Sequence, residues 1–405
     1  MKISITNHTG ARNRGCEALV ASKIIGIQQH IPEAEFTIHS NDPTYDNWRF
    51  SSKAKVVLAY LTKSPDHFQF KSLNKALYKG ALVAENLLPT NLLGYATNSI
   101  SIIKQADLVI SSGGDIFTSD YGNIRKHLAY PILAKKQKSY LCSHSIGPLT
   151  QKDESYFLKA IENVAAISVR ESESYEYLKR LDAQTSLHLT ADVAFTLPTL
   201  PRSDASALLE SLYGLGADKK LVSISISQGI IKYSNLDKHH YYEAFAALID
   251  FITEEGKCAI LVPHVMETNP SNNDLIACYE VLKRSRKKES IRILFGEHSA
   301  IELKGIIGLT ECLVGTRTHA TIASLSQHIP TVSIAYSRKA YGIMRDIYGD
   351  SASKELTIDA KNISGDSLIS AYQLALATQI NIDAINKSKN LSEMNFIIAR
   401  DLLAK

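Results

Sequence analysis

The segment ECLVGTRTHATIASL, residues 311–325, combines a buried strand, a glycine turn and the start of a helix. Residues 311–314 form the short apolar run of a parallel strand, and residues 320–325 have the small and apolar spacing of a helix packed on a sheet. Arg317 and His319 therefore fall where backbone N–H groups and the positive end of a helix dipole favour an anion. A guanidinium can hold a phosphate or carboxylate with two hydrogen bonds, and a histidine can move a proton near neutral pH. The segment is predicted to form an anion-binding site.

The length and composition predict a globular protein of two domains. A chain of 405 residues is too long for one ordinary core, and its 45% hydrophobic and 21% charged residues are typical of a folded protein. The net charge of +4 is too small to indicate nucleic acid as a partner. The one basic run, residues 283–288, falls at an expected helix end, where cations are favourable, so we interpret it as solvated.

Cysteine usage and hydropathy favour a reducing, cytoplasmic location. The five cysteines are scattered and show no CxxC or other metal-ligand spacing, so we expect free thiols and no metal site. The first residues lead directly into a strand and lack the features of a signal peptide. No apolar stretch reaches the ~18 residues that span a bilayer, so no stable membrane insertion is expected.

Short apolar runs alternate with amphipathic ones along the chain, as in parallel sheets flanked by helices. The expected strands of the first half are residues 2–6, 35–39, 55–60, 106–110, 139–145 and 165–169. Those of the second half are residues 221–227, 258–262, 291–295, 311–314 and 331–335. The path of residues 61–100 stays undefined, apart from helical periodicity around residues 77–88.

Two prolines within residues 196–204 block regular structure and mark the expected domain boundary. We expect an N-terminal Rossmann-like domain over residues 1–200 and a C-terminal one over residues 206–380. A last helix, residues 381–405, could pack back on the first domain. The predicted fold class is α/β, with two doubly wound domains facing each other across a cleft. Such sheets bind ligands beyond the carboxyl ends of their strands.

Polar residues follow the expected strand ends in both halves of the chain. In the first half they are Asn13, Arg14, Glu17, Gly113, Gly114, Asp115 and Arg170. In the second half they are His264, Arg317, His319, Ser337, Arg338 and Lys339. Arginine, lysine and histidine side chains gathered at one edge suit a small, strongly anionic ligand.

Two glycine motifs have structural interpretations as well as functional ones. The spacing of Gly10 and Gly15 is that of a phosphate loop, but Cys16 and Glu17 stand where Lys and Ser/Thr are required, so the motif fails as one. Close packing of a strand on a helix explains the glycine pair at 113–114 about as well as ligand approach does.

The basic residues also have structural interpretations. Arg170 could pair with a surface glutamate at 171 or 173, and His264 could be a hydrogen-bonded structural histidine. Arg317 and His319 are harder to explain in this way. A bare helix start favours acidic residues, so two basic groups there need an anion.

Eight short motifs occur in a fixed order. They are NRGxEA (13–18), SGGD (112–115), SIGP (145–148), SVRES (168–172), TADVAF (190–195), VPH (262–264), GTRTHA (315–320) and YxxK (336–339). As an ordered set they resemble the polysaccharide pyruvyl transferases, from about residue 3 to residue 350.

The resemblance implies two Rossmann-like domains arranged as in GT-B glycosyltransferases, with phosphoenolpyruvate as the donor. A pyruvyl group would be transferred onto two hydroxyls of one sugar, forming a cyclic ketal. By position, Arg170 and Arg317 match the family's donor-binding arginines, His319 its general acid, and Lys339 a basic residue near the donor. Two positions depart from the family: Cys16 replaces a common Asp, and Ser112 replaces the first residue of a common triple glycine.

The remaining roles derive from the chemistry of ketal formation. His319 would protonate the methylene carbon of the donor, while the basic residues neutralise the leaving phosphate. Asp115 and Glu17 are candidates for the base that accepts the sugar proton, and His264 could share that work. Thr318 and His264 are assigned to the donor site, and Asn13, Arg14, Gly113 and Gly114 to the acceptor side. No cofactor is expected, and the partners are phosphoenolpyruvate and a saccharide acceptor, either polymeric or lipid-linked.

Two other functions stay open at this point. A GT-B-type glycosyltransferase with a nucleotide-sugar donor would have a similar fold. A non-catalytic protein that closes two lobes over a sugar or phosphate would also present basic residues at the strand ends.

Overall fold

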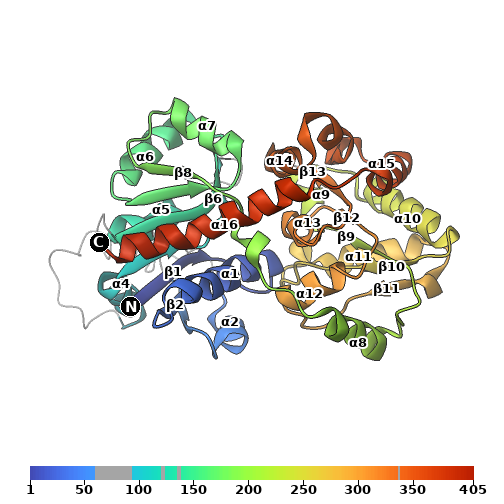
Figure 1. The fold of residues 1–405 in the computed structure, drawn as a ribbon, viewed down its shortest axis with the longest axis horizontal. Helices are drawn as coiled ribbons and strands as arrows, with labels where there is room; N and C mark the ends of the chain where they lie inside the picture. The colour runs from blue at the N-terminus through green and yellow to red at the C-terminus, as the bar shows by residue number, and fades with distance from the viewer. Residues whose placement is uncertain (60–93, 120–123, 135–137, 336–337) are drawn as a thin grey trace. The chain divides into compact units, whose positions relative to one another are not determined.

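The computed structural model describes residues 1–59, 94–119, 124–134, 138–335 and 338–405 (Figure 1). The chain forms two compact units. The first consists of Met1–Ala11, Leu19–Asp192 and Glu393–Lys405, and the second of Arg12–Ala18 and Val193–Ser392. The expected domain ranges were contiguous, whereas each unit also takes in a short segment distant in sequence. The helical periodicity near residues 77–88 lies outside the described residues.

The described part of the first unit is built on an all-parallel sheet. Its strands are β1 (Lys2–His8), β2 (Glu35–Ser40), β3 (Lys55–Leu58), β4 (Leu108–Ser111), β5 (Gly114–Phe117), β6 (Ser139–Ile146), β7 (Ala166–Val169) and β8 (Ser186–Leu189). The strand order is β3-β2-β1-β4-β6-β7-β8, and β5 pairs with β6. The helices of this half of the chain are α1 (Arg14–His30), α2 (Pro43–Phe50), α4 (Gly94–Gln105), α5 (Arg125–Leu133), α6 (Gln151–Ile161) and α7 (Ser172–Arg180).

The second unit has a parallel sheet of the same winding. Its strands are β9 (Leu221–Ser225), β10 (Cys258–Leu261), β11 (Ile291–Ile293), β12 (Cys312–Gly315), β13 (Thr331–Ala335) and β14 (Thr357–Asp359), in the order β11-β10-β9-β12-β13-β14. The helices of this half of the chain are α8 (Arg202–Tyr213), α9 (Gly229–Tyr233), α10 (Lys238–Glu254), α11 (Asp274–Arg284), α12 (Ala300–Ile307), α13 (Thr318–Leu325), α14 (Arg338–Glu355), α15 (Gly365–Ala377) and α16 (Ile382–Leu403). This order is that of a Rossmann-type doubly wound sheet, and it reverses between β9 and β12.

The expected α/β class with two Rossmann-like sheets is confirmed, and every strand expected from an apolar run is present. Three strands were not expected: β5, β8 and β14. β8 is an edge strand whose residues are exposed or half-buried, so it lacks a continuous apolar run. β14 has only three residues, and β5 starts within the glycine pair at 113–114.

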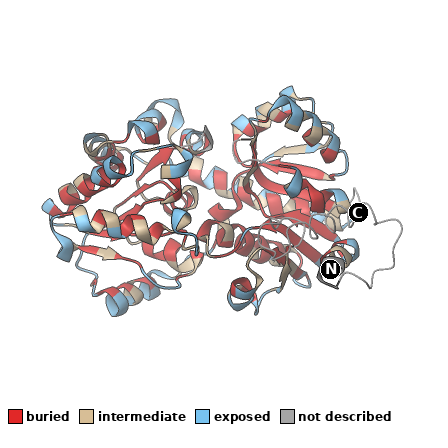
Figure 2. Cartoon of the chain, turned by 180° about the vertical axis from the view of Figure 1, so that it is seen from behind, coloured by how far each residue is buried: buried red, intermediate tan, exposed pale blue. Residues whose placement is uncertain are grey.

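Each sheet is flanked by helices, and most of its strand residues are buried (Figure 2). In the first unit, Phe117, Leu141 and Ile167 of the strands are buried in one cluster with Phe157 of α6 and Leu178 of α7. In the second unit, one such cluster joins strand residues of β9, β10 and β12 to α8, α12 and α13. Most of the strands are buried on both faces, which is why they appear in the sequence as continuous apolar runs.

The C-terminal part of α16 is fixed to the first unit by a buried polar side chain. The Oδ1 atom of Asn395 accepts hydrogen bonds from Ser168 Oγ at 2.6 Å, Tyr140 Oη at 3.2 Å and Thr190 Oγ1 at 3.1 Å. Its Nδ2 donates to the carbonyl oxygen of Ala191 at 3.0 Å. Asn395 is fully buried, so these hydroxyls have no access to bulk water that could replace it.

Asn395→Ala should therefore lower the free energy of unfolding by about 2–4 kcal/mol, because it leaves several buried polar groups unsatisfied. Urea denaturation of the full chain measures this change. Asn390 lies on the same helix and is exposed, so Asn390→Ala is the matched control and should change stability by less than about 0.5 kcal/mol. Equal stability of the two variants would contradict the role given to Asn395.

Candidate functional site

The strand order of the second sheet reverses between β9 and β12, and in such sheets this is where ligands bind. The loop after β9 carries Ser227 and Gln228, and the loop after β12 carries Thr316 and Arg317. The side chain of Thr316 joins the two loops. Its Oγ1 accepts the N–H of Ser227 at 2.7 Å and donates to the carbonyl oxygen of Ser225 at 3.0 Å.

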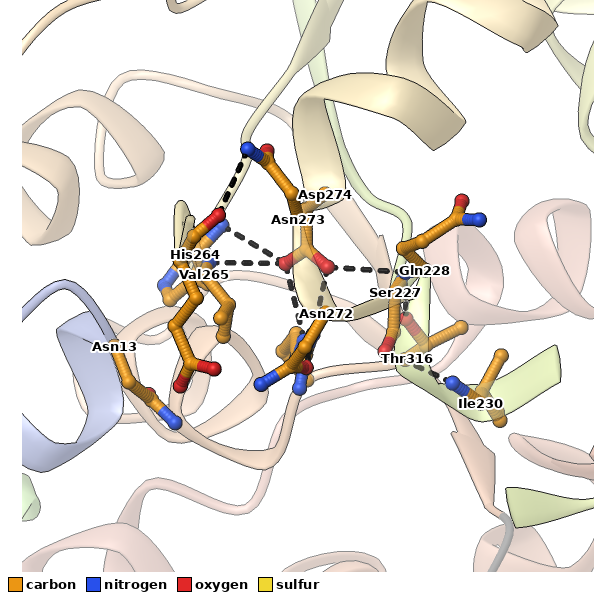
Figure 3. A network of polar contacts seen from close by, with 12 residues as sticks. Asn13, Ser227, Gln228, Ile230, His264, Val265, Asn272, Asn273, Asp274 and Thr316 are labelled. Atoms are coloured by element: carbon orange, nitrogen blue, oxygen red, sulfur yellow. Dashed lines mark hydrogen bonds and ion pairs between the residues drawn. The ribbon is translucent and has the colours of Figure 1, made fainter. Parts of the chain in front are cut away.

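A single buried carboxylate, Asp274, organises this edge of the sheet (Figure 3). Its Oδ1 accepts the backbone N–H of Gln228 at 3.0 Å, and its Oδ2 accepts those of His264 at 3.2 Å and Val265 at 3.0 Å. Arg317 donates to the same carboxylate from Nη2 at 2.6 Å and from Nε at 3.0 Å. Asp274 thereby ties together the loops that follow β9, β10 and β12.

The bidentate pair with Asp274 changes the interpretation of Arg317. The expectation was that a basic residue at a helix start requires an external anion, but the chain itself supplies one. Arg317 is the N-cap of α13, and its side chain is 15% exposed. Its Nη2 also donates to Asn272 Oδ1 at 3.2 Å. Asp274 therefore takes the Nε–Nη2 edge of the guanidinium, and Asn272 takes the other N–H of Nη2.

The segment Arg12–Ala18, which follows β1, runs along this edge of the second unit. Asn13 forms an isolated antiparallel bridge with Val265, and the Arg14 N–H donates to the carbonyl oxygen of His264 at 2.8 Å. The guanidinium of Arg14 is almost completely buried. Its Nη2 binds Glu297 Oε2 at 2.8 Å, and its Nη1 lies 3.3 Å from Glu17 Oε2. The segment therefore connects the loop after β11, which carries Glu297, to the loop after β10.

The same segment packs against His319. A Cβ atom added to Gly15 would lie 2.3 Å from His319 Nδ1, so only glycine leaves room for the imidazole in this position. The Oδ1 of Asn13 accepts the Gly15 N–H at 3.0 Å and so holds the start of α1 in place. Arg14 and His319 also line a small cavity, together with His264 and Lys304. It leaves about 10 Å³ for the centre of a water-sized sphere, which is about the room that one water molecule needs.

His264 is a neutral histidine in this environment. Burial lowers its pKa to about 4, and the nearby charges of His319 and Arg317 act in the same direction. Its Nδ1 lies 3.4 Å from the carbonyl oxygen of Val262, which favours a proton on that nitrogen. An imidazole with this pKa is neutral at pH 7. His264 therefore does not carry the extra proton that a general acid would donate.

Arg170 lies in the first unit and is buried, not on the surface as one interpretation had it. Its Nη1 pairs with Asp192 Oδ2 at 2.5 Å, and its Nε donates to Ser145 Oγ at 2.8 Å. Glu171 lies further away, with 3.8 Å between its Oε2 and the Arg170 Nε. The charge of Asp115 also acts on Arg170, which places these two candidate residues close together in the first unit.

The glycine pair at 113–114 is required by backbone geometry. Both residues have left-handed φ values, +96° and +87°. A Cβ on Gly113 would lie 3.1 Å from the carbonyl oxygens of Cys142 and Ser143, so close packing accounts for this glycine. The fully buried Lys23 holds the same turn, because its Nζ donates to the carbonyl oxygen of Ser112 at 2.6 Å. Burial lowers the pKa of Lys23.

The structure thus divides the predicted site residues between the units. The second unit contains Asn13, Arg14, Glu17, His264, Arg317, Thr318 and His319, and the first contains Gly113, Gly114, Asp115 and Arg170. Lys339 belongs to the first turn of α14, but its side chain lies outside the described part of the structure, as do residues 336–337. Sequence reasoning missed Asp274, Glu297 and Lys23. Only Asp274 had a local signal, because an acid after Asn273 is typical of a capped helix start.

Two features are absent from the described residues. No helix there has the length and apolar character needed to cross a membrane. No group of three or more His, Cys, Asp or Glu side chains in those residues is arranged to hold a metal ion. All five cysteines are free thiols, as expected.

Two Rossmann-type parallel sheets flanked by helices define an α/β protein with units of the GT-B kind. The chain belongs to the polysaccharide pyruvyl transferase family, which matches residues 13–338. It is also similar to the amylovoran biosynthesis protein AmsJ of Erwinia amylovora, with 22% identity over 383 residues, 91% of this chain and 90% of that protein. The resemblance inferred from the ordered motifs is confirmed.

Solved structures with the same fold are far more distant in sequence. The UDP-GlcNAc 2-epimerase of Methanocaldococcus jannaschii has a TM-score of 0.57 at 12% identity and covers 98% of this chain and 99% of its own. Alr3699/HepE of Anabaena, solved with UDP and glucose, has a TM-score of 0.53 at 11% identity and covers 99% of this chain and 97% of its own. At this level of identity the likeness establishes the fold alone.

Asp274→Asn should lower the free energy of unfolding by about 3–5 kcal/mol, because an amide NH2 would face donors and Arg317 would lose its buried counter-charge. Denaturant unfolding of the full chain measures the effect. Asn272→Ala removes only one hydrogen bond to the same arginine and should cost about 1 kcal/mol. If the two variants were equally stable, Asp274 would not be the residue that holds this edge together.

Proposed function

We propose that the protein transfers the pyruvyl group of phosphoenolpyruvate onto two hydroxyls of one saccharide unit, forming a cyclic ketal and releasing phosphate. The observation that carries this proposal is the family match across residues 13–338, which includes the Arg317–His319 helix start and all but the first residue of the Arg12–Ala18 segment packed against it. The similarity to a protein of amylovoran biosynthesis supports an exopolysaccharide, or its precursor, as the acceptor.

The roles proposed for the donor residues depend on their charge and position. Arg317 would bind the donor at the start of α13, next to the N–H groups of that helix. His319 lies in the first turn of that helix and would give the proton that converts the methylene carbon into a methyl group. Arg170 and Lys339 are further candidates for neutralising the phosphate as it leaves.

The proposed reaction balances without a cofactor. Phosphoenolpyruvate and the two sugar hydroxyls contain every atom of the ketal and of the released phosphate, and no electrons are gained or lost. Since phosphoenolpyruvate is a product of central metabolism, we place the reaction in the cytoplasm. The same chemistry serves a polymeric and a lipid-linked acceptor, because the ketal forms on one sugar unit in either case.

The direct test is to incubate the protein with phosphoenolpyruvate and candidate saccharides and to analyse the products by mass spectrometry. The expected product is heavier than the acceptor by about 70 mass units, the pyruvyl ketal, with one phosphate released per ketal. A nucleotide-sugar in place of phosphoenolpyruvate should give no product. Glycosyl transfer from it, without ketal formation, would replace this proposal with the glycosyltransferase alternative.

His319→Gln separates proton transfer from donor binding. The amide keeps a hydrogen-bond donor of similar reach but cannot deliver a proton, so turnover should fall by about 10²–10⁴-fold. Affinity for phosphoenolpyruvate, measured by calorimetry, should change far less. The exposed His239 of α10 supplies the control, and His239→Gln should retain full turnover. If turnover survives in His319→Gln, another group protonates the donor.

A further inference from the structure

Asp115 and Glu17 are the sequence-based candidates for the group that accepts the proton of the sugar hydroxyl, but the second unit contains a better placed carboxylate. Glu297 follows β11 at the carboxyl edge of the sheet, and its side chain is 48% exposed. Its Oε2 is bound by Arg14 Nη2 at 2.8 Å. A general base must contact its substrate, so a carboxylate that is held in place and still open to solvent meets the geometric requirement.

The two sequence-based candidates meet this requirement less well. The side chain of Glu17 is only 6% exposed, and it lies against the buried guanidinium of Arg14. Asp115 is half-buried, and its charge acts on Arg170. Glu297 is in the same unit as His319, the proposed acid.

The Arg12–Ala18 segment connects Glu297 to His319. Arg14 binds Glu297 directly, and the next residue, Gly15, packs against the imidazole of His319 with no room for a side chain between them. Arg14 and His319 also line the same small cavity. One short segment therefore fixes a carboxylate and an imidazole on the same edge of one sheet. Acid–base chemistry on a single substrate requires such a pair.

We propose that Glu297 is the general base that takes the proton from the attacking hydroxyl of the saccharide, an assignment that rests on the proposed pyruvyl transfer. Arg14 would hold the carboxylate through Oε2 while the carboxylate takes up the proton.

The proposed steps balance in atoms and charge. The acceptor oxygen bonds to C2 of phosphoenolpyruvate as its proton passes to Glu297, and the C2=C3 electron pair takes a proton from His319 to form the methyl group. The bond between C2 and the phosphate oxygen then breaks, with its electron pair leaving on phosphate, and the second hydroxyl bonds to C2. The proton of the second hydroxyl leaves with the phosphate, and the proton on Glu297 returns to His319 through solvent.

Glu297→Gln is the first test, with the full chain, phosphoenolpyruvate and a competent saccharide. The amide oxygen can still accept a hydrogen bond from Arg14, and Arg14 keeps its contact with Glu17, so the fold should be retained. The turnover number should fall by about 10²–10⁴-fold, while the dissociation constant of phosphoenolpyruvate and the melting temperature stay close to those of the wild type. Glu280 of α11 forms a matched ion pair with Arg284 at 2.7 Å, and Glu280→Gln should leave turnover unchanged.

Chemical rescue distinguishes a base from a positioning residue. In Glu297→Ala, added formate can occupy the vacated space and accept the proton, so turnover should rise with formate concentration. The same formate should not restore His319→Gln, whose missing group is an acid. If Glu297 has only a structural role, formate should not raise the turnover of Glu297→Ala.

The possible results separate this proposal from the one on which it rests. If the wild type forms the ketal and Glu297→Gln turns over as fast, Glu297 is not the base. If turnover and donor affinity fall by the same factor and formate does not restore Glu297→Ala, the residue positions the site and the proposal is wrong. If the wild type forms no ketal from phosphoenolpyruvate with any saccharide, the proposed function itself fails, and this assignment fails with it.

Discussion

The candidate site in the second unit depends on one buried carboxylate that accepts hydrogen bonds from five N–H groups. Asp274 binds backbone donors from the loops after β9 and β10 and both the Nε and Nη2 of Arg317 after β12. Each of these loops leaves a different strand, and their courses are set by contacts with this carboxylate. A charged acceptor is suited to this task because charge-assisted hydrogen bonds are about twice as strong as neutral ones. Burying a carboxylate without hydrogen-bond donors costs several kcal/mol, about the desolvation penalty of one ion. Asp274 can therefore be buried only because these N–H groups donate to it.

The second constraint is that the segment after β1 belongs structurally to the other unit. Arg12–Ala18 leaves the first sheet and contacts the loops after β10 and β11 and the start of α13. The assignment of Asn13 and Arg14 to the acceptor side stays a prediction. The structure adds their neighbours: Arg14 contacts His264 and Glu297, and Gly15 contacts His319. The residues of this segment lie some 250–300 positions in sequence from the residues that they contact. Local sequence patterns carry no information about contacts over such a separation.

The sequence was sufficient for the fold because buried parallel strands are continuous apolar runs, and the strands of that kind, such as β6 and β12, were all expected. The sequence pattern did not predict β8, which is half-exposed at an edge, or β14, which has only three residues. The strand-end position of Arg317 and His319 was also predictable, since glycine turns and helix starts have local signals. The residues that contact Arg317 and His319 could not be predicted. Asp274 lies 43 positions from Arg317, and Glu297 comes after a three-residue strand, so nothing in either segment indicated an interaction across the sheet edge.

Arg170 and Arg317, which the resemblance predicts to bind the donor, share a property that bears on how an anion could be bound. Arg170 pairs with Asp192 and Arg317 with Asp274, and both aspartates are completely buried. Each pair is neutral overall, so the arginines add little net positive charge to the strand ends. Attraction of an anion would then depend on directed N–H groups of the guanidinium and of the helix start more than on a general positive potential. A neutral pair also avoids the cost of an isolated buried cation while the site is empty. Such a site selects for the shape of its ligand, because a carboxylate or phosphate gains from fixed donors only when its oxygens meet them at hydrogen-bonding distance.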